Sequence, residues 1–399
     1  MDAHAPPRSP ASDGGHGDGD GDTKKPHVLV VPYPAQGHML PLLDLVALLA
    51  ARGLALAVAV TPGNVPLLAP LLASCPPSSV ATVTLPFPAA SASGLLPAGC
   101  GENTKDLPGH LFRPFMASLA ALRAPLLACR PATRSPRRSG SSSCGIWKAH
   151  ASSPNLLTRS RPRTWTPAPG PDGEEGVCGG PLSDADGRCT DRGGKPAVAP
   201  ARVAAWLDAF DDGSVLYVCF GTQQALSPAQ AASLAGALGR SAAPFVWAAR
   251  GGTPVPGGFE AATAARGMVI RGWAPQVEIL RHRAVGWFLT HCGWNSVLEA
   301  VAAGVAMLAW PMSADQFTNA WLLAEAGVAV AVAEGADAVP DAGQMADAIA
   351  SAIGNGGASV RQRAAELGRS TAAAVAEGGS SSVDLEELVS ILSSPKLTN

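Results

Sequence analysis

The stretch Val285-Gly-Trp-Phe-Leu-Thr-His-Cys-Gly-Trp-Asn-Ser-Val-Leu-Glu299 decides the fold. It predicts an apolar strand that ends near Leu289, a tight turn, and a helix that begins near Asn295. Proteins of the α/β class present backbone N–H groups to phosphate in this way, because the positive end of the helix dipole faces the turn. Gly293 lets the backbone approach a ligand closely. The stretch therefore predicts an anion site in a doubly wound α/β domain.

The side chains around this turn have the chemistry to hold a nucleotide. Asn295 and Ser296 add hydrogen-bond donors at the start of the helix, and His291 can donate to the same diphosphate. Glu299 lies one helical turn further on, where a carboxylate can accept from two ribose hydroxyls. Upstream, Trp273 offers a flat face on which a base can stack.

A known signature covers this region. Residues 273–316 begin with Trp-Ala-Pro-Gln and end with Trp-Pro-Met-Ser-Ala-Asp-Gln, and they resemble the 44-residue donor signature of plant secondary-product UDP-glycosyltransferases. The resemblance implies that the first Trp stacks on uracil, that Gln276 and Glu299 hold the ribose, and that the diphosphate lies at the helix start. The donor-binding residues implied in this way are Thr222, Trp273, Ala274, Gln276, His291, Trp294, Asn295, Ser296, Glu299, Asp315 and Gln316.

The end of the signature concerns the sugar. By the same resemblance, Trp294, Asp315 and Gln316 face the hexose. In the family a terminal Gln is associated with glucose donors and a terminal His with galactose donors, so Gln316 predicts UDP-glucose. Thr222 stands where the family usually has Ser near the phosphates. UDP-glucose is then a substrate, and we expect neither a cofactor nor a metal.

A histidine near the N-terminus matches the family's general base. The segment Pro34-Ala-Gln-Gly-His38 follows the predicted strand His27–Val31, and the resemblance implies that His38 takes the proton from the acceptor hydroxyl. An imidazole suits this role, because inverting transfer needs a base whose pKa is near neutral.

The carboxylate that orients this histidine in the family has no counterpart here. The resemblance places that Asp on the strand after the predicted helix Leu111–Leu127, but the next Asp after Asp106 is Asp172. Residues 107–171 contain no Asp or Glu and are rich in Arg, Ser and Pro. We expect residues 128–171 to be aberrant and the acceptor side of the protein to be incomplete.

The chain is long enough for two domains, with 399 residues of which 47% are hydrophobic. Alternating strands and helices over 27–60 and again from 201 predict parallel sheets. The resemblance implies an α/β fold of two facing, Rossmann-like, doubly wound domains of the GT-B type, the first of them incomplete. The expected parts are a disordered tail (1–25), an N-terminal acceptor-binding domain (26–178), a linker (179–199), a C-terminal nucleotide-sugar-binding domain (200–378), and a C-terminal helix and tail (379–399).

Composition excludes several partners. The net charge of −2 gives no field that would hold nucleic acid or an anionic membrane. The apolar run 40–60 is interrupted by Asp44, Arg52 and Gly53, so we expect no membrane span.

The eight cysteines form no CxxC pair, which favours a reducing, cytoplasmic location. The His residues lack metal-ligand spacing, and Asp184-Ala-Asp186 falls in the linker.

Two functions remain open. The first is transfer of glucose from UDP-glucose to a hydroxyl of a small lipophilic acceptor, for which the resemblance suggests flavonoids or other phenolics. The alternative is a catalytically impaired remnant that binds UDP-sugar without efficient transfer. A nicotinamide oxidoreductase is excluded because no GxGxxG follows the first strand, and a P-loop NTPase because Gly194-Lys195 is followed by Pro196.

Overall fold

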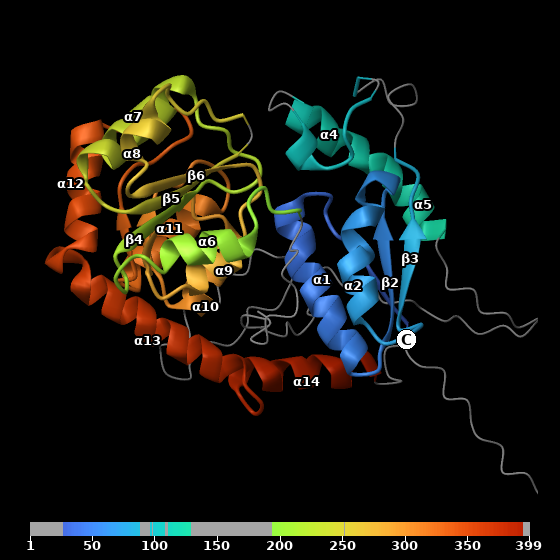
Figure 1. The fold of residues 1–399 in the computed structure, drawn as a ribbon. Coiled ribbons are helices and arrows are strands. Elements are labelled where there is room, and N and C mark those ends of the chain that lie inside the picture. The colour runs from blue at the N-terminus through green and yellow to red at the C-terminus, as the bar shows by residue number, and fades with distance from the viewer. Residues whose placement is uncertain are drawn as a thin grey trace, which may run out of the picture.

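The computed structural model describes residues 27–87, 96–97, 99–107, 111–128, 194–250 and 252–393. The predicted tail (1–25), nearly all of the predicted aberrant segment (128–171) and most of the predicted linker (179–199) lie outside these ranges. Within them the chain forms two α/β units, each built on a parallel sheet (Figure 1). No helix in the described ranges has the length and apolar character needed to cross a lipid bilayer.

The N-terminal unit has a three-stranded parallel sheet in the order β1-β2-β3. The βαβ opening predicted from the sequence is present, and α1 carries the histidine at residue 38 in its first turn. The elements of this unit are β1 (His27–Val30), α1 (Gln36–Ala51), β2 (Ala55–Val60), α2 (Ala69–Ser74), β3 (Val80–Thr84), α4 (Phe112–Ser118) and α5 (Arg123–Ala128).

The single helix predicted over Leu111–Leu127 is wrong. The structure has α4, then a 3-10 segment at Leu119–Leu122, then α5. Pro125 explains the change, because proline lacks the N–H of an α-helical bond and its ring clashes with the carbonyl four residues earlier. The backbone therefore tightens into 3-10 geometry one turn before the proline.

The C-terminal unit has a six-stranded parallel sheet in the order β6-β5-β4-β7-β8-β9. The strands and helices predicted from residue 201 onward are present, and the structure adds the short helices α8 and α9 and the short edge strand β9. The elements are α6 (Pro200–Leu207), β4 (Val215–Cys219), α7 (Pro228–Arg240), β5 (Phe245–Ala249), α8 (Phe259–Thr263), β6 (Gly267–Arg271), α9 (Gln276–Arg281), β7 (Val285–Thr290), α10 (Trp294–Ala303), β8 (Ala306–Ala309), α11 (Gln316–Glu325), β9 (Ala329–Ala331), α12 (Ala342–Ile353) and α13 (Ala358–Val375).

The strand order of this sheet places a ligand crevice between β4 and β7. The chain builds outward from β4 to β6 on one side and from β7 to β9 on the other, so the order reverses between these two central strands. Open α/β sheets bind ligands at the carboxyl ends of the strands at such a switch point. Thr222 follows β4 and His291 follows β7, so both predicted donor residues stand at this point.

The last helix, α14 (Ser380–Ser393), returns to the N-terminal unit. Figure 1 shows α13 and α14 running along the base of both units, with α14 beside α1. Leu385 and Leu392 are buried in the N-terminal core, and Glu386 pairs with Arg52 of α1 at 2.6 Å. The helix predicted for the C-terminus therefore belongs to the core of the first domain.

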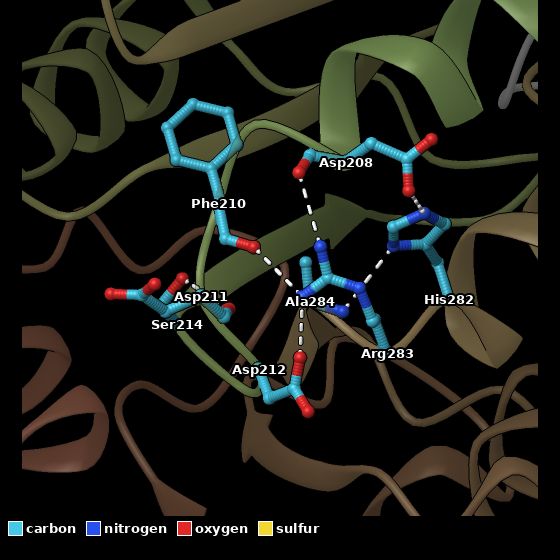
Figure 2. A network of polar contacts seen from close by, with 8 residues as sticks. All are labelled: Asp208, Phe210, Asp211, Asp212, Ser214, His282, Arg283 and Ala284. Carbon is cyan, nitrogen blue, oxygen red and sulfur yellow. Dashed lines mark hydrogen bonds and ion pairs between the residues drawn. The ribbon is translucent and has the colours of Figure 1, made fainter.

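A network of hydrogen bonds and ion pairs lies at the amino-terminal edge of the larger sheet, away from the crevice (Figure 2). Arg283 donates to the carbonyls of Asp208 and Phe210 after α6, and it pairs with Asp212. His282 contacts Asp208 at 3.2 Å. These contacts tie the end of α6 to the loop before β7, and the arginine satisfies carbonyls that a helix end leaves unpaired.

Candidate active site

A cavity of about 770 Å³ lies at the carboxyl edge of the larger sheet, with walls from both units. The N-terminal unit contributes the start of α1 and the side chains of Thr104 and Phe112. Every residue that the sequence proposed for the site lines this one cavity: His38, Thr222, Trp273, Ala274, Gln276, His291, Trp294, Asn295, Ser296, Glu299, Asp315 and Gln316. Residues more than 250 positions apart in the chain thus lie around the same cavity.

The turn after β7 shapes the predicted diphosphate site. Cys292 has φ 60°, a left-handed conformation that is uncommon for a non-glycine residue, and it directs the chain into α10. Two glycines flank the imidazole of His291, because a Cβ at Gly221 or Gly293 would lie 2.6 or 2.5 Å from its ring atoms. Burial lowers the pKa of His291 to about 4, so the ring is neutral at pH 7 and would hold a diphosphate by N–H donation.

The first turn of α10 points its N–H groups at the cavity. Its N-cap is Gly293, so no side chain caps the helix, and no acidic residue lies in its first turn. Ser296 is buried beside this turn, and the Asn295 amide donates across the cavity to the Gly37 carbonyl at 2.9 Å. The helix start therefore offers an electropositive, uncapped end to an anion.

Gln276 and Glu299, the predicted ribose pair, are bonded to each other. Gln276 Nε2 donates to Glu299 Oε2 at 2.8 Å and lies 3.4 Å from Ser296 Oγ. Gln276 Oε1 accepts from the hydroxyl of Tyr217 at 3.2 Å. The carboxylate is thereby supported from α9 on one side, while both groups face the cavity.

Sequence reasoning missed Arg250, which lines the cavity and lies over Trp273. Its Cζ is 4.3 Å from the centroid of the Trp273 ring, a cation–π contact. Burial lowers the pKa of this guanidinium. Arg250 directly follows β5, and its place at the carboxyl end of the strand next to β4 is the signal that could have found it.

At the sugar end, Gln316 faces the cavity with one end of its amide committed. Gln316 Oε1 accepts from the backbone N–H groups of Met312 and Ser313 at 2.9 and 3.0 Å. A carbonyl oxygen has two lone pairs, and both are occupied here. Gln316 Nε2 lies 3.4 Å from Ser313 Oγ, so one hydrogen of the NH₂ bonds there and the other can be donated to a ligand. Neighbouring Asp315 accepts from Asn319 at 2.9 Å.

His38 lies at the opening of α1 and faces the donor residues. The ring of Tyr33 contacts it edge-on, with centroids 5.0 Å apart. Burial lowers the pKa of His38 below 6.5, and the charge of Asp315 opposes that shift. A neutral imidazole is the form that accepts a proton. The carboxylate that acts on this ring within the described residues thus comes from the donor side of the cavity.

The described residues place no three His, Cys, Asp or Glu side chains close enough together to bind a metal ion. The cavity offers instead the imidazoles of His38 and His291, an uncapped helix start, a paired amide and carboxylate, and an aromatic face. These groups suit a nucleoside diphosphate that carries a sugar, with an acceptor on the His38 side.

Proteins with similar sequences are named as glycosyltransferases. The family described as UDP-glucoronosyl and UDP-glucosyl transferase matches residues 189–353. UDP-glycosyltransferase 89A2 of Arabidopsis thaliana is 37% identical over 421 residues, covering 84% of this chain and 89% of that protein. Flavonol 3-O-glucosyltransferase UGT89B1 of the same plant is 35% identical, covering 82% and 88%. Because 421 exceeds the 399 residues of this chain, the first alignment includes positions that this chain lacks.

Solved structures show the same similarity across both units. Arabidopsis thaliana UGT89C1 complexed with UDP-L-rhamnose superposes with a TM-score of 0.76 at 34% identity, covering 93% of this chain and 100% of that one. The complex of the same protein with quercetin gives a TM-score of 0.73 at 32% identity, with the same coverage.

Proposed function

The chain belongs to the plant UDP-glycosyltransferase family and has its GT-B fold, and from this we propose that it transfers glucose from UDP-glucose to a hydroxyl of a small phenolic acceptor such as a flavonol. The observation that carries the proposal is the single cavity into which both units bring every donor and base residue expected from the sequence. The quercetin complex of a similar protein supports the acceptor class.

The choice of sugar rests on Gln316. Relatives named as a flavonol 3-O-glucosyltransferase and a flavonol 7-O-rhamnosyltransferase are both 35% identical to this chain, so overall similarity does not select the sugar. Gln316 lines the cavity, its Oε1 is held by two backbone N–H groups, and its Nε2 lies 3.4 Å from Ser313 Oγ. We propose that the NH₂ of this amide donates to a hydroxyl of glucose.

In the proposed reaction, neutral His38 takes the proton from the acceptor hydroxyl as its oxygen attacks the anomeric carbon. The bond from that carbon to the diphosphate breaks on the opposite face, and the configuration inverts. Charge grows on the departing UDP, and we propose that the N–H groups of α10, Ser296 and His291 stabilise it. The reaction so described needs no metal, and addition of EDTA should leave turnover unchanged.

A second candidate is a protein that binds UDP-sugar but transfers poorly. The specific observation in its favour is that residues 107–171 contain no Asp or Glu, so the carboxylate that the family resemblance places beside the base is absent from this stretch. Without that carboxylate the imidazole of His38 would be oriented less well, and its protonated form would be less stable.

Turnover and binding must be measured together to test these functions. The protein is incubated with UDP-glucose and quercetin, mass spectrometry detects the quercetin glucoside, and calorimetry measures UDP binding. Glucoside formation that His38→Ala abolishes supports the transferase. UDP binding without product supports the second candidate, and absence of both binding and product contradicts the two.

A further inference from the structure

A buried phenol lies beneath the predicted ribose site. Tyr217 of β4 is fully buried, and its ring stacks on Phe288 of β7 with centroids 4.9 Å apart. Its hydroxyl is at the cavity floor, where it donates to Gln276 Oε1 at 3.2 Å. The aromatic ring therefore belongs to the core, and the hydroxyl belongs to the site.

The chemistry of the partners fixes the direction of each hydrogen bond. An ionised carboxylate only accepts, so the Gln276 group that faces Glu299 Oε2 at 2.8 Å must be the NH₂. The carbonyl end of the amide then faces Tyr217 and needs a donor, which the phenol supplies. Without that donor a buried acceptor would be unpaired, and the amide could rotate away from Glu299.

We propose that Tyr217 is a positioning residue for ribose recognition. Its hydroxyl fixes the amide of Gln276, and through that amide it holds the carboxylate of Glu299 in the orientation that accepts from ribose hydroxyls. This inference rests on the proposed function, because it takes UDP as the ligand. A phenylalanine would fill the same space against Phe288, so the core alone does not account for the hydroxyl.

The test compares two ligands in the intact protein. Calorimetry measures the affinity of UDP and of 2′,3′-dideoxy-UDP, which lacks both ribose hydroxyls. Tyr217→Phe should weaken UDP binding about three- to ten-fold and change the affinity for the dideoxy analogue less than about two-fold, as expected for one lost hydrogen bond. The affinities for UDP and for dideoxy-UDP are measured on the same preparation of each variant and expressed as a ratio. A smaller folded fraction in that preparation affects both measurements equally and leaves the ratio unchanged.

The chain's other tyrosine is a matched control. Tyr33 lines the same cavity but donates to Met116 Sδ at 2.7 Å, on the acceptor side. Tyr33→Phe removes the same group and should leave the ratio of UDP to dideoxy-UDP affinity unchanged.

A double-mutant cycle shows whether the phenol acts through the amide. Tyr217→Phe added to Gln276→Ala should weaken UDP binding no further, because the group it positions is already gone. Additive losses, or an equal loss for both ligands in Tyr217→Phe, would overturn the inference. If the unmodified protein binds neither ligand, the proposed function itself has failed. If it prefers UDP and Tyr217→Phe keeps that preference, only this inference has failed.

Discussion

The Asn295 side-chain amide donates to the Gly37 main-chain carbonyl, joining the donor helix α10 to the catalytic helix α1 across the cavity at 2.9 Å. Gly37 immediately precedes His38, so a side chain expected to bind the diphosphate also holds the backbone that carries the base. An amide NH₂ has two hydrogens, so one can remain on Gly37 while the other binds a phosphate oxygen. Donor binding and placement of the base thus depend on the same residue.

We therefore expect Asn295→Ala to lower kcat as well as raise the KM for UDP-glucose. Loss of two hydrogen bonds should reduce kcat/KM about ten-fold or more. Steady-state kinetics with Ser296→Ala as the control measure the difference. Ser296 lies on the same turn and bonds within the donor unit, so its loss should leave the placement of His38 unchanged and lower kcat less than Asn295→Ala does. Equal kcat in the two variants would mean that the contact with Gly37 does not position the base.

UDP binding should depend on the residues expected to meet its base, diphosphate and ribose. Trp273→Ala, His291→Ala and Glu299→Ala should each weaken binding by about 1 to 3 kcal/mol, the range for a lost stacking partner or a charge-assisted hydrogen bond. Calorimetry provides the measurement, with Arg283→Ala as the control at the opposite edge of the sheet. Unchanged affinity in all three variants would remove the donor-site assignment.

Sugar preference should follow the amide of Gln316. Gln316→Glu keeps an acceptor for the backbone N–H groups of Met312 and Ser313 but removes the N–H donors. We expect the preference for UDP-glucose over UDP-galactose to fall about ten-fold in this variant, as one hydrogen bond is lost. Competition assays with UDP-glucose, UDP-galactose and UDP-rhamnose measure it. An unmodified protein that ranks another donor clearly first would contradict the glucose assignment.

The pH dependence of kcat/KM should reflect the protonation of His38 and the negative charge of Asp315, which acts on its pKa. Burial lowers the pKa of His38, so the base stays neutral until the pH falls below the ordinary histidine value of 6.5. We expect kcat/KM to be level near neutrality and to fall only on the acid side of 6.5. Asp315 raises this pKa, so Asp315→Asn should move the acid limb to still lower pH. Movement of the limb to higher pH would contradict the assigned influence of Asp315 on the base.

Turnover of the unmodified protein should be low, and replacement of residues 128–180 by an intact family segment with its Asp should raise it greatly. An imidazole that accepts a proton becomes a cation, which an adjacent carboxylate stabilises and orients. Loss of the equivalent carboxylate from a serine-protease triad lowers turnover by about 10⁴, and we expect an effect in the same direction here. His38→Ala, assayed alongside, gives the background rate. Equal rates before and after the replacement would show that no deficit exists.

The donor-binding residues could be predicted from the sequence because they lie in short, contiguous segments. The strand, turn and helix of 285–299 follow from local periodicity, and the site residues occur at the ends of adjacent strands. The partners of those residues were not predictable in the same way. Arg250 meets Trp273 only after β5 and β6 pair, and the Oε1 atom of Gln316 is committed by backbone N–H groups that no side-chain pattern reveals. At 111–127 the spacing of apolar residues indicated one helix, but Pro125 interrupts it, and the structure has a 3-10 segment between two short helices.

The return of α14 means that the nucleotide-binding unit is, topologically, an insertion in the first domain. The chain leaves the N-terminal unit between residues 128 and 194 and re-enters it after Ala376, through a turn in which Gly378 has φ 73°. A truncation before Ser380 would therefore remove Leu385 and Leu392 from a core far away in sequence and expose the apolar face of α1. An isolated donor domain should accordingly be designed to end near Ala376, where its own helix ends.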